Sequence, residues 1–75
     1  MSVNYAERQY VHNYLSSPAN LNKWYSVEDI SNQIKLSREI VYYYLESILK
    51  SPGGSQVIEK RQLGISKHNE YRAIQ

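Results

Sequence analysis

The chain contains no cysteine among its 75 residues, which excludes disulfide bonds, thiol catalysis and every cysteine-based zinc site. It contains no phenylalanine either, so its eight tyrosines must supply most of the aromatic core as well as any aromatic surface. No run of 18 apolar residues occurs, and the N-terminus lacks the apolar segment of a signal peptide. These absences predict a cytoplasmic protein, not associated with a membrane, whose fold depends on packing alone.

A chain of this length is expected to form one domain over residues 1–75 and to bury only about 60% of its unfolded surface. A large enzyme cleft is therefore not expected. The two histidines are isolated in sequence, and no glycine-rich phosphate loop follows a predicted strand. The sequence thus predicts no enzyme activity, no cofactor, no metal site and no small-molecule ligand.

The net charge of +2 is unevenly distributed along the chain. Five basic and five acidic residues cancel in the stretch that ends at Ile58. All the net positive charge therefore lies in the C-terminal segment, which carries Lys60, Arg61, Lys67 and Arg72 against Glu59 and Glu70.

Helical spacing predicts a first helix over about residues 4–16. Asn4 and Glu7 have the spacing of a capping box, and Pro18 disfavours continuation of the helix. The aromatic stretch at residues 23–26 favours a short strand. The expected apolar stripe of this first helix comprises Ala6, Tyr10, Val11, Tyr14 and Leu15.

Two further helices are predicted over residues 27–34 and about 38–49, with Ser26 and Ser37 as their N-caps. The sequence "KSPGGS" ends the third helix, and the apolar period then changes to two. A β-hairpin is therefore predicted within residues 56–75, with strands "QVIEKRQ" and "EYRAIQ". The inward stripe of the third helix is expected to be Val41, Tyr44, Leu45 and Ile48.

The pattern "VEDISNQIKLSREIVYYYLE" followed by "VIEKRQLGISKHNEYRAI" resembles the winged helix-turn-helix family of DNA-binding domains. The resemblance covers nearly the whole chain. It implies an α+β fold with three helices, a short first strand and a C-terminal β-hairpin wing. Small size and tyrosine-rich composition also resemble the single-domain transcription regulators of archaeal viruses and plasmids.

The resemblance implies sequence-selective binding of double-stranded DNA and regulation of transcription. The third helix would enter the major groove and the wing would follow phosphates or the minor groove. Carried over by position, the groove-facing residues are Ser37, Arg38, Glu39, Tyr42 and Tyr43. The backbone contacts would come from Lys35, Lys50, Lys60, Arg61, Lys67, His68 and Arg72.

Two departures from the family pattern are present; the first is common, and only the second leaves an alternative open. Lys35 occupies a turn position where many members have glycine, and the acidic Glu39 and Glu46 on the third helix would repel phosphate. The alternative function is a winged-helix module that binds a partner protein. On that interpretation the acidic, tyrosine-bearing face contacts a protein instead of DNA. Separately, Tyr42 and Tyr43 could pack in a homodimer or form a passive surface. Many DNA-binding members of the family are dimers, in which two recognition helices reach successive major grooves about 34–36 Å apart.

Overall fold

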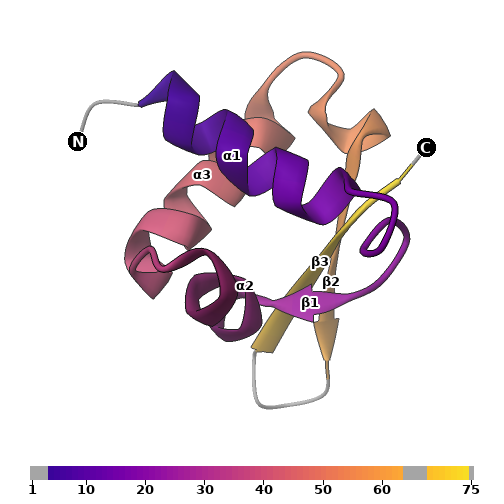
Figure 1. Ribbon diagram of the computed structural model, residues 1–75. Coiled ribbons are helices and arrows are strands. Elements are labelled where there is room, and N and C mark those ends of the chain that lie inside the picture. Colours follow the sequence, from indigo (N-terminus) through magenta and orange to yellow (C-terminus); the bar gives the residue numbers. More distant parts are fainter. Residues whose placement is uncertain (1–3, 64–67, 75) are drawn as a thin grey trace.

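The computed structural model describes residues 4–63 and 68–74, and shows a small α+β fold compatible with the winged-helix arrangement. Three helices cover one face of a three-stranded antiparallel sheet (Figure 1). The elements in chain order are α1 (Tyr5–Ser16), β1 (Tyr25–Ser26), α2 (Val27–Ile34), α3 (Arg38–Lys50), the 3₁₀ helix η1 (Gly54–Gln56), β2 (Ile58–Leu63) and β3 (His68–Ala73).

Helix α1 begins at the predicted cap, with the Asn4 side chain accepting hydrogen bonds from the backbone N–H groups of Ala6 and Glu7. The predicted capping box is only half formed, because the Glu7 carboxylate accepts a hydrogen bond from the Tyr44 hydroxyl instead. The predicted stripe of the helix is only partly confirmed. Val11 and Leu15 are buried, whereas Ala6 is exposed and Tyr10 is 52% exposed. The reason is geometric, because Ala6 and Tyr10 lie on the side of the helix that is rotated away from Val11 and Leu15.

Helices α2 and α3 have the predicted bounds to within one residue, and both begin at the predicted serine caps. Ser26 forms a capping box with Asp29, and Ser37 accepts a hydrogen bond from the Ile40 N–H. The turn between the helices is fixed by the buried Ser31, whose hydroxyl donates to the Leu36 carbonyl oxygen at 2.5 Å. The inward stripe of α3 is confirmed in full: Val41, Tyr44, Leu45 and Ile48 are buried.

The sheet has the strand order β1-β3-β2, so β3 is its central strand. Strand β1 is shorter than the predicted residues 23–26 and pairs Tyr25 with Tyr71. Strand β2 begins at Ile58 rather than at residue 56, because residues 54–56 form the unpredicted helix η1. Strand β3 begins at His68, two residues earlier than predicted, because Asn69 and His68 still pair across the hairpin with β2.

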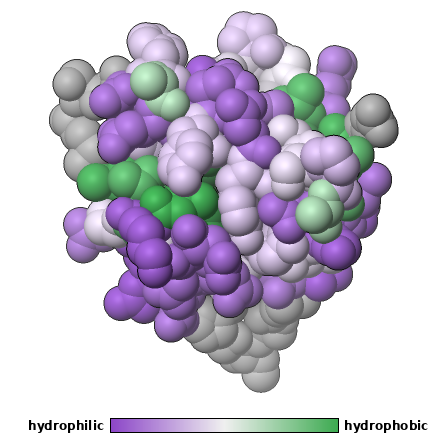
Figure 2. Space-filling view, in the orientation of Figure 1, coloured by the Kyte–Doolittle hydropathy of each residue, from purple (hydrophilic) through white to green (hydrophobic). Residues whose placement is uncertain are grey.

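The two faces of the hairpin have different roles. Ile58, Tyr71 and Ala73 point to the helices and are essentially fully buried. The alternate positions carry charged side chains on the opposite face, as strand geometry requires. In the view of Figure 2, hydrophilic side chains cover most of the visible surface and strongly apolar ones emerge only in separated areas. The core therefore lies between the helices and one face of the sheet.

Gly53 and Gly54 link α3 to η1 and impose two different constraints. Gly53 has φ 77° with open space around a hypothetical Cβ, whereas a Cβ on Gly54 would overlap the carbonyl oxygen of Ile48.

We expect Gly53→Ala to lower the free energy of unfolding by about 1–2 kcal/mol, the usual cost of a left-handed non-glycine residue. Gly54→Ala should cost about 3 kcal/mol, the upper end of the usual cost of overpacking, because the backbone must move. Urea unfolding of the two variants compares these costs directly; equal losses would contradict the assignment.

Candidate nucleic-acid interface

The first half of α3 presents a polar edge to solvent. Ser37, Arg38 and Glu39 are exposed, and the Tyr42 side chain beside them is 45% exposed. The opposite side of the same helix is buried against the rest of the fold. Local structure explains the arrangement, since the Ser37 cap starts the helix and the buried stripe fixes its rotation. Four of the five residues predicted to face the major groove therefore lie together on an accessible edge.

The three consecutive tyrosines of α3 have three different environments. Tyr42 is the exposed member, whereas Tyr44 is buried and its hydroxyl donates to a carboxylate oxygen of Glu7 at 2.7 Å. Tyr43 lies between these extremes: it packs against the edge of the core, with its ring centroid 5.8 Å from that of Tyr44. Tyr43 is thus less available to a ligand than the sequence pattern implied, because its ring also covers the core.

Lys35 occupies the turn immediately before the exposed edge of α3. Its backbone has φ 62° and ψ 36°, in the left-handed region where glycine is the favoured residue. Its side chain is exposed, as is that of Arg38. Within residues 4–63 and 68–74, neither cation forms an ion pair with a carboxylate. The start of α3 therefore carries two positive charges that a bound anion can reach.

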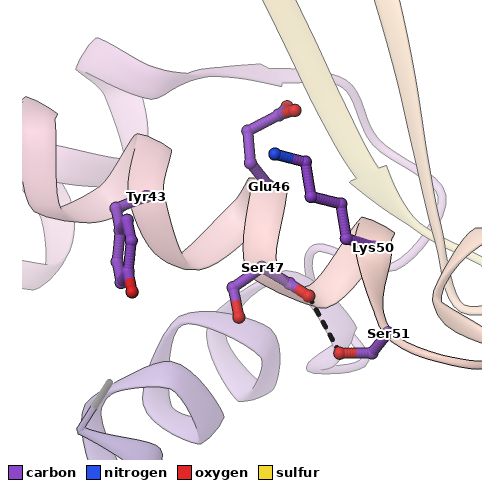
Figure 3. Close-up of a pocket in the computed structure, with 5 residues that line it drawn as sticks. All are labelled: Tyr43, Glu46, Ser47, Lys50 and Ser51. Atoms are coloured by element: carbon purple, nitrogen blue, oxygen red, sulfur yellow. Dashed lines mark hydrogen bonds between the residues drawn. The ribbon is translucent and has the colours of Figure 1, made fainter. Parts of the chain in front are cut away.

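Lys50 lies at the opposite end of α3, about 18 Å from Arg38 by helix rise. It lines a shallow pocket of about 320 Å³ together with Tyr43, Glu46, Ser47 and Ser51. Figure 3 shows the Lys50 chain extending toward Glu46, and Ser51 donating a hydrogen bond to the Ser47 carbonyl. Lys50 is therefore not grouped with Lys35 and Arg38, and its charge lies near a carboxylate.

Glu46 connects α3 to the hairpin. One of its carboxylate oxygens accepts hydrogen bonds from the buried Tyr71 hydroxyl at 2.8 Å and from the Lys60 ammonium at 3.0 Å. Burial alone would raise the pKa of Glu46, but the two hydrogen bonds together with the positive charges of Lys60 and Lys50 outweigh it and lower the pKa below the ordinary 4.5. Burial, together with the contact with Glu46, raises the pKa of Tyr71. Glu46 and Lys60 thus neutralise each other.

The outer face of the hairpin carries two ion pairs across the strands. Arg61 lies opposite Glu70, with two N–H groups within 2.9 Å of one carboxylate oxygen, and Arg72 lies opposite Glu59 in the same manner at 2.5 Å. The Trp24 ring covers both arginines, at 4.3 Å from the Arg61 guanidinium and 4.5 Å from that of Arg72. These predicted phosphate contacts are therefore already occupied by carboxylates.

Two further predicted contacts cannot be placed. Lys67 and the side chain of His68 lie outside the described residues, although the His68 backbone belongs to β3.

Sequence reasoning missed Trp24, Glu59 and Glu70 as parts of this surface. Their outward position could have been predicted, because Glu59 and Arg61, like Glu70 and Arg72, alternate with inward-facing positions. Which residues pair across the strands could not be predicted without the strand register.

Comparison with known proteins finds no matching family model, no significantly similar curated protein and no significantly similar solved structure. None of the helices described here is both long enough and apolar enough to span a membrane. Among the described side chains, no group of three histidine, aspartate or glutamate residues is placed to hold a metal ion. The function must therefore be argued from the geometry of this surface.

The Glu46 contacts generate a pH-dependent contribution to stability. Because the folded pKa is lowered, the ionised Glu46 stabilises the fold above pH 4.5, and this contribution is lost as the pH falls through the folded value. We expect Glu46→Gln to lose less stability than the wild type between pH 6 and pH 3.5, measured by urea unfolding. Glu39→Gln, on the exposed edge of the same helix, is the matched control. A steeper acid loss in Glu46→Gln than in the wild type would contradict this assignment.

Proposed function

We propose that the protein binds double-stranded DNA with sequence selectivity, as a winged helix-turn-helix regulator of transcription that acts by occupying an operator. The observation that carries the proposal is the exposed edge of α3 from Ser37 to Tyr42, with Lys35 and Arg38 beside it free of carboxylate partners in the described chain. The remaining support comes from how this edge is held and charged.

The α2–α3 turn supports the proposal because it holds the edge rigidly. The Ser31 hydroxyl is bonded to the Leu36 carbonyl, and the left-handed Lys35 reverses the chain within a few residues. A major groove about 12 Å wide admits one helix, and readout requires its side chains to be positioned before contact. A helix fixed in this way can present the same side chains to every site it meets.

The chemistry of the exposed edge suits base recognition. Arg38 can donate two hydrogen bonds to guanine O6 and N7, and Glu39 can accept one from cytosine N4. The Tyr42 ring can contact a thymine methyl, or its hydroxyl a phosphate oxygen. One well-formed bidentate pair would contribute about 1–3 kcal/mol of discrimination between bases.

The acidic residues of α3 oppose this proposal less than the sequence suggested. Glu46 already accepts hydrogen bonds from Tyr71 and Lys60, so its charge is compensated within the protein. Glu39 is left as the carboxylate on the exposed edge, where it penalises sites that do not offer it a donor. A single repulsive group beside two cations favours selectivity over general affinity.

A second copy of the chain would extend the recognition site. One α3 reaches a single major groove, and two copies could reach successive grooves about 34–36 Å apart. In the cell such a regulator would be a cytoplasmic, DNA-associated protein, controlled by its own abundance or by its association. Binding of a partner protein remains the second candidate, favoured by the carboxylate pairing of Arg61 and Arg72 and by the exposed rings of Tyr5 and Tyr10.

The first test is an NMR titration of labelled protein with a mixed-sequence duplex at about 50 and 200 mM salt. We expect salt-sensitive shifts that include residues 35–43, because this edge carries the free cations.

Arg38→Gln should reduce the affinity for DNA several-fold and relax the base preference measured by selection from a random duplex library. Lys23→Gln, which removes an equal charge from the loop before β1, serves as the control. Absence of shifts at low salt would sink the DNA proposal and favour a protein partner.

Lys35→Gly separates binding from stability. Glycine relieves left-handed strain of about 1–2 kcal/mol but costs roughly 0.5–1 kcal/mol of chain entropy, so stability should change little or rise slightly. If the Lys35 ammonium contacts a phosphate, the slope of log affinity against log salt should become shallower by about 0.9. Thermal unfolding and fluorescence anisotropy measure the two effects, and an unchanged slope would remove Lys35 from the interface.

A further inference from the structure

The outer face of the β2–β3 hairpin carries as much negative charge as positive charge in its two cross-strand pairs. Arg61 pairs with Glu70 and Arg72 with Glu59, each directly opposite the other in the strand register. In both pairs the arginine uses its Nε–H and a terminal N–H group on one carboxylate oxygen. In each arginine, two adjacent N–H donors that could bind a phosphate are therefore bound to a carboxylate.

Trp24 restrains the same two guanidinium groups from a second direction. The central carbons of both guanidinium groups lie over the Trp24 ring, within 4.5 Å of its centroid, in cation–π contact. Trp24 is held just before β1, where Tyr25 pairs with Tyr71 of the central strand. Each arginine is thus held both by a carboxylate and by the Trp24 ring.

The arginines nevertheless lie within reach of solvent. Their side chains are 44% exposed for Arg61 and 32% exposed for Arg72, so a duplex laid against the hairpin could meet them. What opposes phosphate binding is charge and donor geometry, because each partner carboxylate occupies two N–H donors of the guanidinium group and would repel a second anion. Removal of the carboxylate charge, with the shape retained, would make these cations available.

We propose that Glu59 and Glu70 limit the affinity of the protein for DNA of any sequence, because they hold Arg61 and Arg72 away from the phosphates. This inference rests on the proposed DNA binding by α3. Phosphate contacts add nearly the same free energy at every sequence, whereas base contacts made by α3 differ between sequences. A hairpin face with no net charge therefore lowers the affinity for all sites by the same factor. The differences in affinity between sites then come from the base contacts of α3.

The test is the double variant Glu59→Gln with Glu70→Gln, studied with a mixed-sequence duplex by fluorescence anisotropy from about 50 to 200 mM salt. Each arginine released to a phosphate should steepen the slope of log affinity against log salt by about 0.9, so two should steepen it by about 1.8. That change corresponds to an additional loss of affinity of about 12-fold over this fourfold range of salt. Each single variant should give about half of the change in slope.

The matched control is Gln9→Lys with Asn13→Lys, which adds the same two charges to the exposed side of α1. It should keep the wild-type slope, because those cations lie outside the hairpin. Adding Arg61→Gln and Arg72→Gln to the double variant should abolish the extra slope. Thermal unfolding monitored by circular dichroism checks that each variant is folded, and the single variants remain informative if the combinations are not.

The outcomes separate the two proposals. If the wild type binds duplex DNA and the double variant has the same salt slope, the role of Glu59 and Glu70 is overturned while DNA binding stands. An increase equal to that of the α1 control would overturn it as well, since general charge would then explain the effect. If the wild type shows no binding at 50 mM salt, the proposed function itself fails, whatever the variant does.

Discussion

The hydrogen bond from Tyr71 to Glu46 is the contact on which the arrangement of the candidate surface depends. Tyr71 is fully buried on the central strand β3, which pairs with β1 on one side and β2 on the other. Its hydroxyl needs a partner, because burial of an unpaired hydroxyl costs about 1–3 kcal/mol. Glu46 provides that partner from α3, and Lys60 balances the charge from β2. One polar cluster thereby fixes α3 relative to the whole sheet.

The same fold divides the cations into two groups. Lys35 and Arg38 stand at the start of α3 without carboxylate partners in the described chain, whereas Lys60, Arg61 and Arg72 are each paired. The net charge of +2 therefore does not describe which cations are accessible to an approaching anion. The distribution favours a ligand that contacts the α2–α3 turn first, and it gives the hairpin a mainly structural role in the free protein.

Much of the fold could be predicted because its signals are local. The caps Asn4, Ser26 and Ser37, the apolar period of α3 and the change to a period of two after "SPGGS" depend only on neighbouring residues. The predictions were wrong where a contact between residues distant in sequence decides burial or strand length. The predicted apolar stripe of α1 spanned two sides of the helix, and only the packing of α3 and β3 against α1 decides that Val11 and Leu15 are buried while Tyr10 is exposed. Strand limits shifted for the same reason, since a strand extends only as far as its partner does.

The sequence by itself determined the element order, the caps, the buried stripe of α3 and the exposed position of Ser37, Arg38 and Glu39, because helix geometry follows from spacing along the chain. Only the tertiary structure decided which charges are free. Glu59 and Arg72 are 13 residues apart in the sequence, and Trp24 is remote from both, so no local pattern shows that they meet. Charge compensation is a property of the register between strands, and the register is set by which hairpin residues the helices bury.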